Sequence, residues 1–328
     1  MKKQIQTRKA AGRKAAGPLA KLGLTQLMAV MAAANLLYPR KPAKPRKPGY
    51  NKNGVVIFEN DSIVAIATGL KSRSANAKTG SMIQVWILVR NVSPLDAIKL
   101  GLDKAICIDC PHMGRLVDGL VKDRRCYVNV GQAPMSVWKC YQNGGYRMAE
   151  ESEYGALFGD RFVRFGSYGE PVLIPLPILQ AIAAVSRDWT GYTHQWRREE
   201  YAEYRSLLMA SADSDRDSWD ANSLGWRYFR VRAAGDTTLD AGEIKCPASK
   251  ESGNRVKCED CRLCNGVKHG ENETRKNIVI QDHSNIAKRK PLQNQPLIQI
   301  SLGAPSLAPM VETQTQAYIR QVSYLPAY

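Results

Sequence analysis

The chain has 328 residues, of which 44% are hydrophobic and 23% charged. This length and composition fit a globular protein with its own core and exclude a small disulfide-stabilised scaffold. The net charge is +17, but residues 1–50 hold twelve of the 47 Lys and Arg and none of the 30 Asp and Glu. The other 278 residues carry a net charge of only +5, so a polyanion-binding surface is expected on the N-terminal segment alone.

Residues 1–50 are predicted to form a basic arm. The Ala, Leu and Met content of residues 19–38 predicts a helix, and residues 39–48, rich in Pro and Lys, predict an extended linker. Lys21 and Gln26 interrupt the apolar run of the helix, so a transmembrane span is not favoured. We expect a flexible arm, with contact to nucleic acid or an anionic membrane surface as the alternative.

From residue 51 onward the pattern is that of an α/β protein. A hairpin is predicted first, and then strands alternate with helices. The predicted strands are 54–59, 62–67, 82–89, 162–166, 190–194, 207–212, 227–232 and 277–281, and the predicted helices are 133–142, 176–186, 199–206 and 215–224. This alternation predicts a parallel sheet, open or closed into a partial (βα)6 barrel-like form.

Four segments follow from this pattern. They are the basic arm and linker (1–50), a (βα) barrel-like domain with the first cysteine site (51–235), a second cysteine site with the last strand (236–285), and an extended Pro- and Gln-rich tail (286–328). Clustered cysteines in a long, core-forming chain indicate metal or cluster ligation in a reducing cytoplasm rather than disulfides.

The first cysteine group is Cys107, Cys110 and Cys126, at C-x2-C-x15-C spacing. Two thiolates at C-x2-C spacing can reach one metal centre from a tight turn, and the third comes from the same segment, which is predicted to be a loop. A zinc site would need a fourth ligand, whereas a four-iron cluster would keep one iron open for a small molecule.

His112 and Cys140 are the candidates for that fourth ligand. For His112 three interpretations are about equally favoured: a metal ligand, a residue that supports a ligand, and a plain turn residue. Cys140 lies on the predicted helix 133–142, on the same side as Val137 and Tyr141, so a core position is the favoured interpretation.

The second group consists of Cys246-Pro247 and the run Cys258-x2-Cys261-x2-Cys264. Four cysteines complete a site, and the double x2 spacing with a distant Cys-Pro is typical of ferredoxin-type four-iron clusters. Zinc, which four thiolates also suit, is the alternative.

Polar residues also follow several predicted strands. His194, Asp213 and Asp282 stand at strand ends, where ligand sites of parallel barrels collect, so they predict a polar pocket on one face. Asp213 would also serve as a helix cap. Arg230 and Arg232 alternate along a strand and are expected either to line this pocket or to lie on the surface.

A further motif ends the strand at 162–166, where the sequence reads Ser167-Tyr-Gly169-Glu170-Pro171. A strand, a three-cysteine loop and a second strand ending in Gly-Glu-Pro resemble the radical S-adenosylmethionine enzymes, over about residues 80–285. In that family the cysteine spacing is C-x3-C-x2-C and a second Gly stands at the position of Tyr168.

This resemblance implies an open four-iron cluster on the first cysteine group and an auxiliary cluster on the second. It places Gly169 and Glu170 beside S-adenosylmethionine, with Tyr127 and His194 as further cofactor contacts. It also implies a flavodoxin or ferredoxin as the reductant.

The chain is also similar to cysteine-rich phage and mobile-element proteins of the mycobacteriophage gene-product-88 type. The shared points are residues 76–80 (NAKTG), Cys-Pro followed by Cys-Tyr, and the late Cys-Pro and Cys-x2-Cys loop. This implies a phage or prophage origin and cytoplasmic action in the host. Two functions stay open: a radical S-adenosylmethionine-type enzyme, and a non-enzymatic zinc or iron–sulfur protein that binds nucleic acid in phage replication or packaging.

Overall fold

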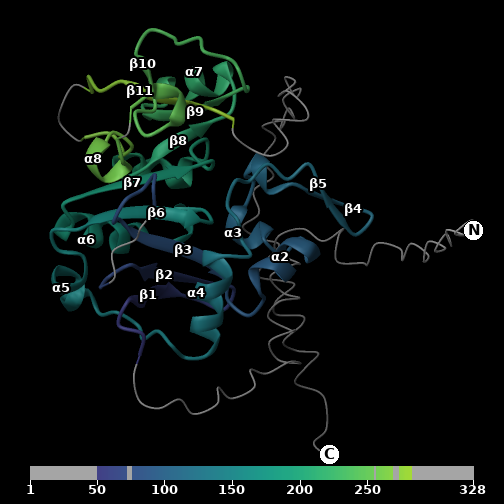
Figure 1. Ribbon diagram of the computed structural model, residues 1–328, viewed down its shortest axis with the longest axis vertical. Helices are drawn as coiled ribbons and strands as arrows, with labels where there is room; N and C mark the ends of the chain where they lie inside the picture. Colours follow the sequence, from purple (N-terminus) through teal and green to yellow (C-terminus); the bar gives the residue numbers. More distant parts are fainter. Residues whose placement is uncertain (1–49, 72–75, 255, 269–272, 283–328) are drawn as a thin grey trace, which may run out of the picture. The chain divides into compact units, whose positions relative to one another are not determined.

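The computed structural model describes residues 50–71, 76–254, 256–268 and 273–282. Its main feature is a nine-stranded sheet with the order β1-β2-β3-β6-β7-β8-β9-β11-β10 (Figure 1). The strands are β1 (Gly54–Glu59), β2 (Ile63–Thr68), β3 (Ile83–Val89), β6 (Phe162–Tyr168), β7 (Asp188–Thr193), β8 (Met209–Ala212), β9 (Tyr228–Arg232), β10 (Glu243–Lys245) and β11 (Asn277–Gln281). The predicted arm, apart from Tyr50, and the predicted tail lie outside the described residues.

Most of this sheet is parallel. Strands β1 and β2 form the predicted antiparallel hairpin, and β2 pairs antiparallel with β3. From β3 onward all neighbours are parallel, and β3, β6, β7, β8, β9 and β11 lie side by side in chain order. Among the described residues the edge strands β1 and β10 do not pair, so the sheet is open. The predicted α/β class with a large, mostly parallel sheet is confirmed.

Local sequence explains where the elements form. Strand β3 reads IQVWILV, and its β-branched and aromatic side chains are mostly buried. Helices α4 (Ala133–Gln142) and α6 (Leu176–Val185) each have Pro in the first turn, where no backbone donor is needed. Helix α7 (Asp215–Ser223) begins at Ser214, whose hydroxyl accepts from the backbone N of Asp217 at 3.1 Å.

Other helices are short. They are α2 (Pro94–Leu100), α3 (Lys104–Cys107), α5 (Tyr154–Phe158) and α8 (Cys258–Cys261), with the 3-10 helices η2 (Pro111–Met113), η3 (Glu151–Glu153), η4 (Pro171–Leu173), η5 (Glu199–Ser206) and η6 (Lys250–Ser252). No helix in the described part of the chain combines the length and apolar character needed to cross a membrane.

The segment between Cys107 and Cys126 differs from the predicted loop. It contains η2 and a hairpin of β4 (Arg115–Val117) and β5 (Leu120–Lys122). Asp118 and Gly119 make the turn with φ of 52° and 72°, the positive values that a two-residue hairpin turn requires. The loop prediction was therefore wrong for this part of the segment.

Arg230 and Arg232 lie neither in the predicted strand-end pocket nor on the surface. They lie on the opposite sheet face from Phe229 and Val231, and both are buried against Glu243, whose side chain is fully enclosed. Segment 236–282 supplies that carboxylate through β10, and β10 and β11 extend the same sheet beyond β9. A buried ion-pair cluster thus joins the second cysteine segment to the sheet.

Candidate metal centre

A cavity of about 380 Å³ lies against one face of the parallel sheet. Strands β6, β7, β8, β9 and β11 contribute to its lining. Among the lining residues are Arg164, Gly166 and Tyr168 of β6, Thr190 and Tyr192 of β7, and Phe229 and Val231 of β9, which alternate along their strands as the residues of one sheet face do. All seven predicted ligand cysteines line this same cavity: Cys107, Cys110, Cys126, Cys246, Cys258, Cys261 and Cys264. The predicted cofactor contacts Tyr127, Gly169, Glu170 and His194 line it as well. Two cysteine groups far apart in sequence therefore face one space.

Short helices and a hairpin position the first cysteine group. Cys107 ends α3, and the backbone N of Cys110 donates to the Cys107 carbonyl at 2.9 Å. The β4–β5 hairpin then returns the chain, so that the backbone N of Cys126 donates to the His112 carbonyl at 2.8 Å. The hairpin thus brings a distant third cysteine back to the C-x2-C turn.

The second group is attached to the sheet by its backbone. Cys246 follows β10, Cys258 begins α8, and Cys264 is buried with its carbonyl accepting from the backbone N of Gly191 on β7 at 3.1 Å. The backbone N of Cys258 donates to the carbonyl of Lys78 at 2.8 Å, so the Asn76–Gly80 bridge packs against α8. The side chain of Tyr192 hydrogen-bonds with the Cys264 thiol.

Burial opposes ionisation of most of these thiols. It raises the pKa of Cys107, Cys126, Cys246, Cys261 and Cys264, in the last case to about 12. A buried thiolate needs a compensating positive charge, and a metal that binds it must release the proton. The donor set is therefore suited to a metal centre and poorly suited to free, reactive thiolates.

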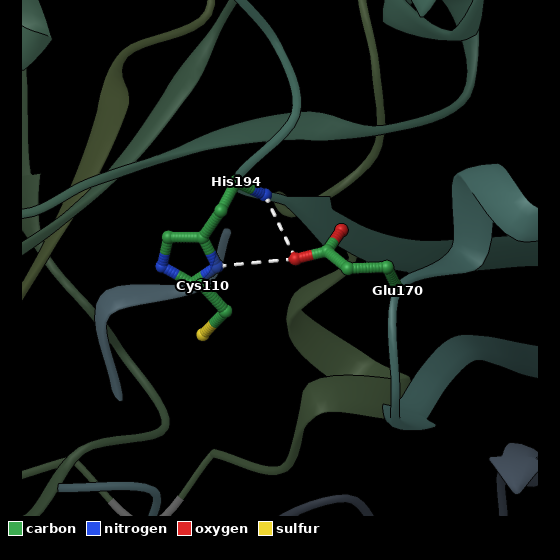
Figure 2. A group of neighbouring side chains, drawn as sticks. All are labelled: Cys110, Glu170 and His194. Atoms are coloured by element: carbon green, nitrogen blue, oxygen red, sulfur yellow. Dashed lines mark hydrogen bonds and ion pairs between the residues drawn. The ribbon is translucent and has the colours of Figure 1, made fainter. Parts of the chain in front are cut away.

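Glu170 connects the end of β6 to the end of β7, and Figure 2 shows its carboxylate turned toward His194 beside Cys110. One carboxylate oxygen accepts from Thr193 Oγ1 at 2.7 Å, and the other accepts from the backbone N of His194 at 3.1 Å and lies 3.3 Å from its Nδ1. The backbone N of Glu170 donates to the Ile106 carbonyl at 2.7 Å. The Gly-Glu-Pro strand end is thereby tied to the residue before Cys107.

Asp213 is not a helix cap but the centre of a histidine pair. Its oxygens lie 2.7 Å from His112 Nε2 and 3.3 Å from His194 Nε2, and the two imidazole rings are 5.4 Å apart. Burial raises the pKa of the Asp213 carboxyl, but His112 and His194 outweigh burial and hold it far below its ordinary value. For His194, burial lowers the pKa, but Cys110 and Asp213 outweigh burial and raise this pKa well above its usual range.

Two predicted positions are resolved by the structure. Cys140 lies away from this cavity, half-buried on α4, with its thiol accepting from Asn51 Nδ2 at 3.7 Å. Tyr127 is 73% exposed, yet its hydroxyl accepts from Arg164 Nη2 at 2.7 Å at the cavity wall. Arg164 was not among the predicted site residues, because nothing in a strand sequence tells which face an arginine uses.

Comparison of the chain with protein-family models, curated proteins and solved structures finds no match. Function must be inferred from the cavity itself.

Among the described residues, two groups of potential ligands have their atoms within 4.8 Å of one another: Cys110–Glu170–His194 and His112–His194–Asp213. Neither cysteine group forms such a close set, although all seven thiols are among the described residues.

Gly169 is expected to tolerate no side chain. Its φ is +84°, and an added Cβ would lie 2.8 Å from both Cβ and the carbonyl O of Ile87. We expect Gly169→Ala to lower the free energy of unfolding by about 2–4 kcal/mol, from backbone strain and overpacking together. Urea denaturation measures this loss. Gly144→Ala is the matched control, because Gly144 has φ +67° and no heavy atom near the added Cβ, so only strain of about 1–2 kcal/mol applies. Equal losses in the two variants would contradict the contact with Ile87.

Proposed function

We propose that this chain is an iron–sulfur enzyme of the radical S-adenosylmethionine type that acts in the cytoplasm of a phage or prophage host. The observation that carries the proposal is the single cavity lined by a three-cysteine group, a four-cysteine group and the Gly169–Glu170 strand end. Three thiols leave one iron of a four-iron cluster open, whereas four thiols saturate a second cluster.

In this proposal Cys107, Cys110 and Cys126 hold the open cluster, and the second cysteine group holds the auxiliary one. The bound cluster would supply the electron that cleaves the sulfonium bond of S-adenosylmethionine, after reduction by a flavodoxin or ferredoxin. Glu170 would hold the amine of the cofactor, since its carboxylate has lone pairs beyond those used by Thr193 and His194. Tyr127 and His194 border the same space.

Zinc and four-iron clusters differ in the sulfur spacing that they impose. Zinc bonds of about 2.3 Å bring four tetrahedral sulfur atoms within about 4 Å of one another. A four-iron cluster instead binds each thiolate through a different iron and holds the sulfur atoms farther apart. Neither cysteine group has three or more thiols within 4.8 Å of one another, and metal analysis distinguishes the two arrangements.

The strand order also supports the proposal. Six parallel strands in chain order are what a partial (βα)6 barrel needs, and the cysteine loop follows the first of them, β3, as in the radical enzymes. The C-x2-C-x15-C spacing differs from the C-x3-C-x2-C of that family. The β4–β5 hairpin accounts for the longer interval, because it returns Cys126 toward Cys110.

Metal content tests the proposal. Protein purified without oxygen is expected to be brown and to hold about eight irons, four for each cluster. Replacing Cys107, Cys110 and Cys126 by Ala should remove about half of the iron and all cleavage of S-adenosylmethionine by the dithionite-reduced protein. Replacing Cys258 and Cys261 by Ala should remove the other half.

Cys140→Ala is the matched control, because Cys140 lies outside the cavity and its loss should leave iron content unchanged. A colourless protein with two zinc ions would overturn the radical-enzyme proposal. It would favour the alternative, a non-enzymatic zinc protein that binds nucleic acid through residues 1–50.

A further inference from the structure

Arg164 differs from the other buried arginines of the described chain. Arg227, Arg230 and Arg232 each have a carboxylate within ion-pair distance: Glu273 at 3.8 Å, Glu243 at 2.5 Å and Asp236 at 3.1 Å. Arg164 is 9% exposed and has no carboxylate within 4 Å among the described residues. Its guanidinium is therefore a buried cation without a matching protein anion.

The surroundings of Arg164 point toward the cavity. Its Nη2 donates to the Tyr127 hydroxyl at 2.7 Å, and its Cζ lies 5.8 Å from the centre of the Tyr192 ring. These contacts occupy one of its five N–H donors and supply only a weak electrostatic partner. The side chain of Arg164 lines the cavity, so its remaining N–H groups lie at the cavity wall.

Thr190 is the second group without a partner at this place. It pairs with Arg164 across β6 and β7, so the two side chains stand next to each other on the same sheet face. Thr190 is 3% exposed, and its hydroxyl has no hydrogen-bond partner among the described residues. An acceptor with negative charge would satisfy both this buried cation and the buried hydroxyl beside it.

We propose that Arg164 and Thr190 bind an anionic group of the substrate, a carboxylate or a phosphate, on the wall of the cavity. An arginine fork matches both anions with two parallel N–H donors, and the Thr190 hydroxyl supplies a third. The assignment of the anion to a substrate rests on the proposed function, whereas the anion site itself is independent of that function. Arg164 and Thr190 line the same cavity as Cys110 and Glu170.

The second cysteine group is the competing source of negative charge, because the thiols of Cys258 and Cys264 interact electrostatically with Arg164. Within the described residues, however, Arg164 donates no hydrogen bond to a cysteine sulfur, and Cys264 is hydrogen-bonded instead by Tyr192. A cluster there would also leave the Thr190 hydroxyl without a role.

Calorimetric titration of the full-length protein, purified without oxygen, tests the anion site with inorganic phosphate and with acetate as separate probes. The native protein is expected to bind at least one of them, and the tighter one identifies the substrate group as phosphate or carboxylate. Arg164→Met is expected to weaken binding about 10- to 100-fold, and Thr190→Val about 3- to 10-fold. Arg187→Met is the matched control, because it removes an equal charge from an exposed position outside the cavity and should change nothing.

Iron is measured in the same samples, so the two proposals fail separately. A protein without iron that still binds phosphate through Arg164 sinks the radical-enzyme proposal and supports the anion site. The anion site is overturned if neither probe binds the native protein. It is equally overturned if Thr190→Val and Arg164→Met bind like the native protein, or if Arg164→Met loses iron from the second cysteine group while Thr190→Val keeps full affinity. Arg164→Lys, which keeps the charge, should retain partial affinity and guards against misfolding of the Met variant.

Discussion

Replacement of Glu170 by alanine is expected to reduce cleavage of S-adenosylmethionine by up to about a hundredfold while iron content stays unchanged. A hydrogen bond between charged groups contributes up to about 3 kcal/mol, which corresponds to a factor of about 100 in affinity. Glu170 is 5% exposed and lines the cavity beside Cys110. Its carboxylate accepts hydrogen bonds from Thr193 and His194, neither of which is a predicted cluster ligand. Loss of the carboxylate should therefore act on the cofactor and not on the clusters.

Cofactor binding by the oxygen-free protein, measured by equilibrium dialysis, and iron content, measured on the same samples, check this expectation. Thr193→Val is the matched control. It removes the 2.7 Å hydrogen bond to Glu170 but keeps the carboxylate, so cleavage should fall only a few-fold. If Glu170→Ala loses iron to the same extent as it loses cleavage, the carboxylate supports the metal centre and the proposed role in cofactor binding is wrong.

The sequence predicts most of the sheet because strand formation depends on local composition. Strand β1, helix α4 and strand β11 begin and end at the predicted residues, since each is a short run of apolar or helix-forming residues between clear breaks. The hairpin between Cys110 and Cys126 was missed although Asp118-Gly119 between apolar residues is a signal for a two-residue turn.

Local sequence patterns could not predict that the two cysteine groups share one cavity. The shared cavity depends on β7, where Tyr192 contacts Cys264, and on His194, directly after the end of this strand, which contacts Cys110. Two residues of a strand span about 7 Å, so one strand brings the two cysteine groups to neighbouring parts of one space. No spacing within either cysteine motif contains this information, because it is set by the order of the strands.

The same limit applies to Arg230, for which the largest loss of stability is expected. Its side chain is 1% exposed and lies 2.5 Å from Glu243, whose side chain is 0% exposed. Arg230→Met is expected to lower the free energy of unfolding by about 3–5 kcal/mol, because it removes the nearest cation of a buried carboxylate and leaves only the more distant Arg232 at 3.5 Å to balance its charge. The hydrogen bonds that Glu243 accepts from the Tyr228 hydroxyl at 2.9 Å and the backbone N of Asp240 at 2.8 Å remain. Urea unfolding followed by circular dichroism measures the change.

Arg216→Met is the matched control, since Arg216 is 65% exposed and pairs with Asp220 on the surface of α7, where a salt bridge contributes less than about 1 kcal/mol. Adding Glu243→Gln to Arg230→Met should recover part of the loss, because a neutral amide costs less to bury than a carboxylate that has lost its nearest cation. Recovery in this double variant would locate the cost in the stranded charge of Glu243. Equal stability of the single and double variants would instead attribute the loss to packing of the arginine stem, and β10 would then be held to the sheet without an essential ion pair.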